Sequence, residues 1–168
     1  TNTATQDITV NVTNINDSSP VFTSSATFSA FENQTSIGTV TATDADGDSV
    51  TFTVLGSELA ITSAGVLTFT SAPDYETKST YTATVTVSDG ANSTTQAITV
   101  NVTNVNDIAP AFTSSATFSA AENQTAIGTL TATDAEGDDI TFTISGSELA
   151  ITSAGILTFK TAPDYETK

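Results

Sequence analysis

Apolar and polar residues alternate along much of the chain with a period of two, which is the side-chain spacing of a half-buried β-strand. Residues 80–88 show this most clearly, because threonines there alternate with aromatic or aliphatic residues. Threonine favours extended structure, since its branched Cβ packs well on a pleated surface. No segment shows helical periodicity, so the pattern predicts an all-β chain. The apolar positions that we expect in its core are Phe22, Phe28, Val40, Phe52, Leu59, Ile61, Leu67, Phe69, Tyr81, Val85, Val87, Ile98, Val100 and Val102.

Turn-forming residues separate seven strand candidates between Pro20 and Asn104. The separators include Asp46-Gly47, Ala64-Gly65 and Asp89-Gly90, which are typical of tight turns. Seven short strands at this spacing predict a two-layered antiparallel β-sandwich of the immunoglobulin-like type, with Greek-key connections. The candidate strands span residues 21–30, 36–43, 49–54, 58–62, 65–69, 80–88 and 95–103.

The chain contains two copies of one unit, offset by 90 positions. Residues 7–78 align with residues 97–168 without a gap, and 56 of the 72 aligned positions are identical. A unit of this size can bury a modest core, so each copy is expected to fold as a small domain. We predict that residues 1–16 are the last strand and linker of a preceding repeat, residues 17–106 a complete repeat, and residues 107–168 a second, truncated repeat. Because the second repeat lacks its last two strands, its sandwich is expected to have open edges.

Composition excludes several classes of function. Nineteen acidic residues against three lysines give a formal charge of −16, so nucleic acid and anionic membrane surfaces are poor partners, and no apolar run is long enough for membrane insertion. His, Cys, Met and Trp are absent, which removes Ser-His and Cys-His nucleophiles and thiolate or imidazole metal sites. We therefore predict no catalytic residues. Carboxylates are the remaining strong ligands, and oxygen-only coordination suits calcium.

The acidic residues gather at strand ends and turns in an order that resembles the cadherin repeat. Glu32 resembles that family's acidic residue after the first strand, and Asp44-Ala45-Asp46 resembles its Asp-x-Asp motif. Asp74-Tyr75-Glu76 resembles its Asp-Arg-Glu motif, and Asp89-Gly90 its Asp near the penultimate strand. The hinge from Asn104 to Ile108 resembles its Asp-x-Asn-Asp-Asn linker. The likeness covers the whole chain, in the style of the cadherin-like domains of large bacterial surface adhesins of the RTX type.

The resemblance implies that Ca²⁺ binds where successive repeats meet. We expect up to three ions at the junction between the copies, two of them in well-formed sites, because Asn104 replaces an Asp of the family linker. Without metal these carboxylates repel one another, by about 4 kcal/mol for two charges ~4 Å apart at an effective dielectric of 20, so an empty hinge should splay. The implied ligands at this junction are Glu32, Asp74, Glu76, Asn104, the Val105 carbonyl, Asn106, Asp107, the Ile108 carbonyl, Asp134 and Glu136. At the N-terminal hinge, a single ion could be held by residues drawn from Asn16, Asp17, Ser18, Asp44, Asp46 and Asp89.

These features together predict a calcium-rigidified spacer and adhesion module of a secreted or cell-surface bacterial protein, such as a biofilm adhesin. Its partners would be calcium and the neighbouring repeats of the same chain. The alternative is a sandwich that binds polysaccharide or another copy of the protein, which an exposed aromatic patch would favour. Two other interpretations are weak. Leu55 stands where an EF-hand beginning at Asp44 needs a bidentate Glu, and glycoside hydrolysis by Asp74 and Glu76 would lack an aromatic cleft.

Overall fold

The computed structural model describes residues 1–167, which form two compact units, one from Thr1 to Asn104 and one beginning at Val105. Lys168, the last residue of the predicted second repeat, lies outside the described residues. All regular structure in the described chain is β-strand, which confirms the all-β prediction. Residues 1–167 contain no helix long and apolar enough to cross a membrane.

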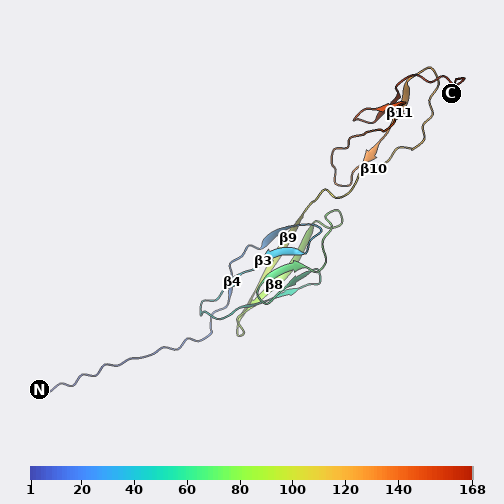
Figure 1. The fold of residues 1–168 in the computed structure, drawn as a ribbon. Helices are drawn as coiled ribbons and strands as arrows, with labels where there is room; N and C mark the ends of the chain where they lie inside the picture. Colours follow the sequence, from blue (N-terminus) through green and yellow to red (C-terminus); the bar gives the residue numbers. More distant parts are fainter. Residues whose placement is uncertain (168) are drawn as a thin grey trace. The chain divides into compact units, whose positions relative to one another are not determined.

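Unit 1 is built from a four-stranded sheet, a three-stranded sheet and a short two-stranded ladder, which form a sandwich (Figure 1). The four-stranded sheet has the order β2-β9-β8-β5 and the three-stranded sheet the order β3-β7-β6. β8 and β9 form the longest ladder, from Thr80 opposite Asn101 to Ser88 opposite Ser93. The strands are β1 (Val21–Phe22), β2 (Thr27–Phe31), β3 (Ser36–Thr39), β4 (Ala42–Thr43), β5 (Thr51–Leu55), β6 (Leu59–Ile61), β7 (Val66–Phe69), β8 (Thr80–Ser88) and β9 (Ser93–Thr103).

Two of the predicted strands are each divided in the structure, and one strand pair is parallel. The predicted strand at residues 21–30 separates into β1, which pairs with β4, and β2, which runs parallel to β9. The predicted strand at residues 36–43 separates into β3, which pairs with β7, and β4. When a strand changes its pairing strand, its backbone hydrogen bonds change but its side chains still alternate between the two faces. The hydrophobic pattern of the sequence therefore could not reveal these divisions. The prediction of a wholly antiparallel sandwich is therefore wrong for β2 and β9.

The core of unit 1 lies between the two larger sheets. Phe52, Val85 and Ile98 from the four-stranded sheet join Leu67 and Phe69 from the three-stranded sheet in one buried cluster. Burial of this apolar surface is the main force that holds the two sheets together. All predicted core residues belong to the cluster, fully buried or packed partly buried against it, and Ala30 is an additional member. The fully buried ones are Val40, Phe52, Leu59, Leu67, Phe69, Val85, Val87, Ile98, Val100 and Val102, and the partly buried ones are Phe22, Phe28, Ile61 and Tyr81.

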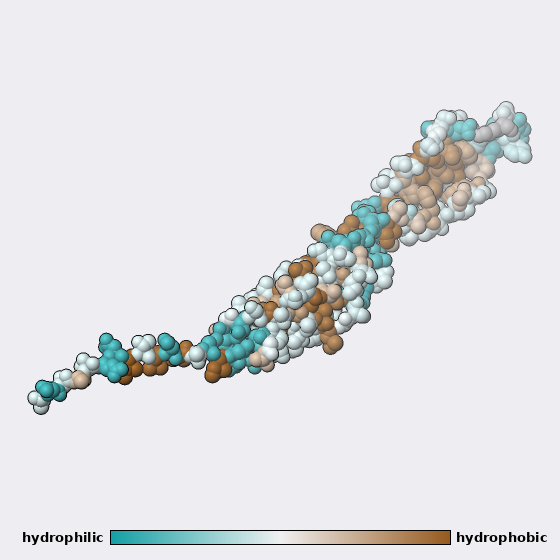
Figure 2. All heavy atoms as spheres, turned by 60° about the horizontal axis from the view of Figure 1, so that its bottom comes forward, coloured by the Kyte–Doolittle hydropathy of each residue, from teal (hydrophilic) through white to brown (hydrophobic). Residues whose placement is uncertain are grey.

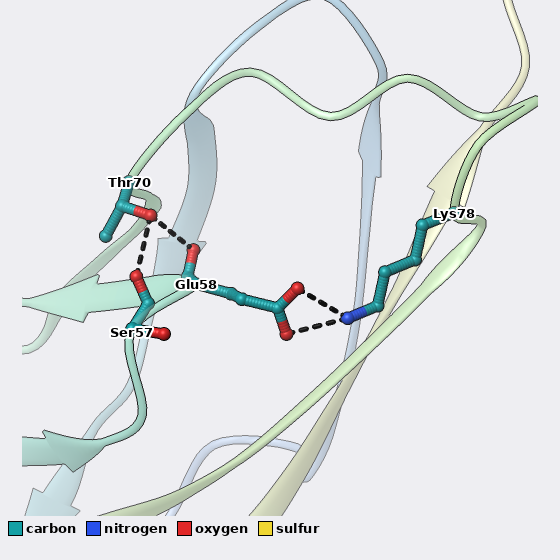
Figure 3. A network of polar contacts seen from close by, with 4 residues as sticks. All are labelled: Ser57, Glu58, Thr70 and Lys78. Atoms are coloured by element: carbon teal, nitrogen blue, oxygen red, sulfur yellow. Dashed lines mark hydrogen bonds and ion pairs between the residues drawn. The ribbon is translucent and has the colours of Figure 1, made fainter.

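Within residues 1–167, charged residues lie in turns, linkers and the N-terminal segment, since no described strand contains Asp, Glu or Lys. One ion pair joins two such turns, where Lys78 Nζ lies 2.5 Å from Glu58 Oε1 (Figure 3). The Thr70 hydroxyl donates to the carbonyls of Ser57 and Glu58 nearby, at 2.9 and 3.1 Å. Both charged side chains are exposed, so this pair contributes little stability.

Unit 2 repeats part of this arrangement with fewer strands. Residues 117–121 and 141–145 form no strand, although their counterparts in unit 1 are β2 and β5. β2 and β5 pair with β9 and β8, and no segment of residues 105–167 takes the place of those two strands. Phe112 is consequently 68% exposed, and apolar side chains gather on the surface of this unit (Figure 2). Its strands are β10 (Ala111–Phe112), β11 (Ala126–Thr129), β12 (Ala132–Thr133), β13 (Leu149–Ile151) and β14 (Ile156–Phe159).

Residues 1–13 do not form the strand that their alternation predicts. Ile8, Val10 and Val12 are 80%, 79% and 92% exposed. A strand needs a neighbour that accepts and donates its backbone hydrogen bonds, and no described segment pairs with these residues. The assignment of residues 1–16 to a preceding repeat stays a prediction.

Candidate metal centres

One end of unit 1 carries a cluster of three carboxylates. Oxygen atoms of Glu32, Asp74 and Glu76 lie within 4.8 Å of one another. Glu32 is only 3% exposed, and its carboxylate accepts a hydrogen bond of 2.8 Å from the Tyr75 backbone N–H. Glu32 directly follows β2, and its own N–H donates to the carbonyl of Thr103 at the end of β9. The parallel pairing of β2 and β9 thus places the buried carboxylate beside the start of the linker.

The loop that contains Asp74 supplies hydrogen bonds to its carboxylate. The Thr77 hydroxyl donates to Asp74 Oδ2 at 3.0 Å, and the Thr77 N–H donates to Oδ1 at 3.1 Å. These two hydrogen bonds, led by the hydroxyl, hold the pKa of Asp74 below its ordinary value. Asn104, the next residue after Thr103, has a buried Oδ1 with no hydrogen-bond partner.

A second carboxylate cluster lies at the opposite end of β9, in the turn between β4 and β5. Oxygen atoms of Asp44, Asp46 and Asp48 lie within 4.8 Å of one another. Asp44 Oδ1 accepts hydrogen bonds from the N–H groups of Asp46 at 2.9 Å and Asp48 at 3.4 Å, and this curls the turn around its carboxylate. The other oxygen, Asp44 Oδ2, is buried and has no hydrogen-bond partner.

The N-terminal linker is fastened to this second cluster. Asp46 Oδ2 accepts the N–H groups of Asp17 at 3.0 Å and Ser18 at 2.8 Å, and the Asn14 amide donates to the Asp46 carbonyl at 2.9 Å. The Ser18 N–H contributes most to lowering the pKa of Asp46, while the negative charge of Asp89 opposes that effect. The linker and the acidic turn therefore form one hydrogen-bonded assembly.

Asp89 joins this assembly from the turn between β8 and β9. Its Oδ1 accepts the N–H groups of Ala91 at 2.7 Å and Asn92 at 2.6 Å. The Asn92 N–H is the main cause of the lowered pKa of Asp89. The Asn92 side chain in turn donates to Asn16 Oδ1 and to the Ser18 carbonyl, both at 3.0 Å.

Unit 2 contains the corresponding linker and acidic turn. Asp134, Glu136 and Asp138 bring carboxylate oxygens within 4.8 Å of one another. Glu136 accepts the N–H groups of Asp107 at 3.1 Å and Ile108 at 3.0 Å, one with each oxygen. The longer Glu therefore makes the same two linker contacts that Asp46 makes with a single oxygen. Unit 2 also repeats the first cluster with Glu122, Asp164 and Glu166, all of them exposed.

The structure brings most of the predicted ligands together within each unit and adds residues that the sequence did not single out. In unit 1 the predicted residues meet at two separate ends, and Asn104 and Val105 belong to different units. Asp48, Asp138 and Asn92 were not predicted. A signal existed for both aspartates, because Asp48 ends the run Asp44-Ala45-Asp46-Gly47-Asp48 and Asp138 ends the run Asp134-Ala135-Glu136-Gly137-Asp138. Asn92 gave no signal, because its partners lie more than 70 positions away.

These groups fit a hard divalent cation such as calcium. The donors are carboxylate, amide and carbonyl oxygens, which calcium prefers. Clustered carboxylates also repel one another unless a positive charge lies between them. The unpartnered buried oxygens of Asp44 and Asn104 are a further indication, since a buried acceptor without a partner is costly.

Comparisons with known proteins are consistent with this fold. A family model described as Bacterial Ig domain matches residues 16–103. Cadherin EGF LAG seven-pass G-type receptor 1 of Homo sapiens is 33% identical over 143 residues, and its Mus musculus counterpart is 32% identical. Each match covers 76% of this chain, which spans only 5% of the length of these relatives.

Solved structures of cadherin ectodomains superpose well on the chain. Human Protocadherin-24 EC1-2 has a TM-score of 0.74 at 21% identity, over 92% of this chain and 82% of that one. Mouse Cadherin-23 EC22-24 has a TM-score of 0.70 at 23% identity, over 90% of this chain and 57% of that one. At such identities the likeness concerns the fold alone. The chain therefore belongs to the bacterial Ig domain family, and its fold is that of a cadherin-like β-sandwich.

Proposed function

We propose that this chain is a structural and adhesion module of a secreted or cell-surface bacterial protein, in which calcium stiffens the connection between successive repeats. The observation that carries the proposal is the placement of carboxylates at both ends of unit 1. One cluster contains Glu32 and the other contains Asp44. They lie at opposite ends of the eleven-residue strand β9, on the order of 30 Å apart. The strands between them carry no charge.

Such a distribution suits a repeat that binds cations where it meets its neighbours. Glu32, Asp74 and Glu76 would hold calcium from the end of one repeat. Asn106, Asp107, Asp134 and Glu136 would hold it from the beginning of the next. Bound calcium supplies positive charge that offsets the repulsion between carboxylates. The chain's own contribution is to prearrange the oxygens, through the Tyr75 N–H at Glu32 and the Thr77 hydroxyl at Asp74.

The same residues give no support to catalysis. The chain lacks His, the most common general base near neutral pH, and Cys, the most reactive side-chain nucleophile. We accordingly assign the carboxylates to cation binding alone.

Calorimetric titration of the chelator-treated chain with calcium, combined with small-angle scattering, tests the proposal. We expect saturable uptake of more than one ion per chain, and a narrower distribution of interdomain distances in calcium than in chelator. Titration with sodium chloride at matched ionic strength is the control that separates binding from screening. No heat of binding, together with identical scattering in calcium and in chelator, would overturn the proposal.

A further inference from the structure

We propose that Asn92 is a positioning residue that locks the N-terminal linker, residues 14–18, onto the acidic end of unit 1 in the absence of any cation. The lock is a property of unit 1 alone. Its consequence for calcium affinity rests on the function proposed above.

The backbone of Asn92 is held by hydrogen bonds that do not involve its side chain. Its N–H donates to Asp89 Oδ1 at 2.6 Å. Its carbonyl accepts the Asp89 N–H at 3.2 Å and the Ser88 hydroxyl at 2.9 Å. The side chain therefore projects from a closed turn that directly precedes β9, which limits the positions that its amide group can take.

From this base the amide group reaches the linker at two points. Nδ2 donates to Asn16 Oδ1 at 3.0 Å and to the Ser18 carbonyl at 3.0 Å. Asp46 holds the same linker from another direction, through the N–H groups of Asp17 and Ser18. Neither of the two linker oxygens that Asn92 uses belongs to a carboxylate.

Unit 2 shows the linker without this contact. The counterpart of Asn92, 90 positions further on, is not among the described residues 105–167. The backbone contacts of the linker are retained there, because Asp107 and Ile108 donate to Glu136. The linker amide differs, however, since Asn106 Nδ2 donates to the carboxylate of Asp138.

The comparison indicates what Asn92 accomplishes. In unit 1 the linker amide presents its oxygen to Asn92, whereas in unit 2 the linker amide occupies a carboxylate oxygen of the acidic turn. Asn92 therefore keeps the linker from using Asp48, the counterpart of Asp138. A linker ordered in advance also has less conformational freedom to lose on binding a ligand. The N-terminal cluster should consequently bind calcium more tightly with Asn92 than without it.

The lock can be tested without calcium. The chain has no cysteine, so Ile15→Cys, at a position that is 72% exposed, gives a single site for a spin label in the linker. In chelator, Asn92→Ala should raise the mobility of this label and speed hydrogen exchange at the Asp17 and Ser18 amides about tenfold, because their opening becomes easier. Asn101→Ala, at an exposed position on β9, is the matched control and should change neither quantity.

A second variant keeps the test decisive if Asn92→Ala disturbs the turn. Asn16→Ala removes one of the two linker acceptors of Asn92 and leaves the hydrogen bonds among Ser88, Asp89 and Asn92 in place, so it should also raise label mobility. Unchanged mobility and exchange in both variants would overturn the proposal. In calcium titrations, we expect Asn92→Ala to weaken binding at the N-terminal cluster about tenfold, by loss of preorganisation. If the linker is protected in chelator but calcium never binds, the proposed function fails and the lock stands.

Discussion

Glu32 holds a carboxylate in an almost fully buried position. Removing a charge from water is costly unless hydrogen bonds or an opposite charge compensate for it. Tyr75 supplies a hydrogen bond, but Asp74 and Glu76 add negative charge within 4.8 Å of Glu32 oxygens. The local arrangement therefore favours a cation beside Glu32 more strongly than beside the exposed acidic residues.

Replacing the Glu32 carboxylate should lower the stability of the chain in calcium but not in chelator. Glu32→Gln should weaken calcium binding about tenfold, which removes about 1.4 kcal/mol of calcium-dependent stabilisation. In chelator the variant should be at least as stable as the parent chain, since one repelling charge is gone. Urea denaturation in each condition measures both effects. The control is Glu58→Gln, which breaks the exposed pair with Lys78 and should lower the free energy of unfolding by under about 1 kcal/mol, equally in calcium and in chelator. The expectation would be contradicted if calcium stabilised Glu32→Gln as much as it stabilises the parent chain.

At the scale of single residues, the sequence predicts the acidic motifs better than their partners. Glu32, Asp44 and Asp74 stand at strand ends and turns in an order that resembles the cadherin repeat, and this resemblance singled them out as candidate ligands. Asn92 depends on contacts with a linker more than 70 positions away, and one sequence contains no record of such contacts. The unpartnered oxygen of Asn104 likewise depends on burial, which becomes visible only in three dimensions.

At the scale of elements, nearly the same segment is a strand in one unit and irregular in the other. Residues 27–31 form β2, whereas residues 117–121, which differ from them only in the last residue, form no strand. The difference is the ladder partner, because β2 hydrogen-bonds to β9 along its whole length. Alternation therefore predicted which residues face the core, while the presence of a strand also required a neighbour that a local pattern does not reveal.

Supplying the partners should restore the strands of unit 2. In a longer chain that repeats residues 79–104 after Lys168, residues 117–121 and 141–145 should become strands, because copies of β9 and β8 then complete their ladders. Chemical shifts and hydrogen exchange of those residues report the change. The same extension with Val100→Ala and Val102→Ala in the added copy is the control, and it should be less stable by about 2 kcal/mol for each substitution. Persistent irregular structure in the unmodified extension would refute the expectation.

At the scale of the whole molecule, charge and fold occupy different parts of the chain. The chain has a net charge of −16, and the fourteen strands found in residues 1–167 contain no charged residue. Hydrophobic burial therefore holds each sandwich together, while electrostatics acts at its ends. Cations can thus change how the ends behave and leave the packing between the sheets as it is.

Because the charges lie outside the strands, we predict that the melting temperature depends on salt concentration in chelator and much less so in calcium. In chelator, raising sodium chloride from ~0.01 M to ~0.15 M shortens the screening length from about 30 Å to about 8 Å. Repulsion among the carboxylates then weakens, and the melting temperature should rise by a few degrees. If calcium binds the clusters as proposed, it neutralises them, so the same change of salt should have a much smaller effect. Scanning calorimetry at both salt concentrations measures this, and equal shifts with and without calcium would contradict it.

Because Asn92 makes hydrogen bonds to the linker, the host cell in which the protein is produced should affect how firmly the linker is held. Asn92-Ser93-Thr94 is an acceptor sequence for N-linked sugars, which attach to the side-chain nitrogen. That nitrogen is the donor to both Asn16 and Ser18, and a sugar on it would replace one hydrogen and crowd the other. Material secreted by a eukaryotic host that modifies this site would have a loosened linker, whereas material from a host without the modification would keep it fastened.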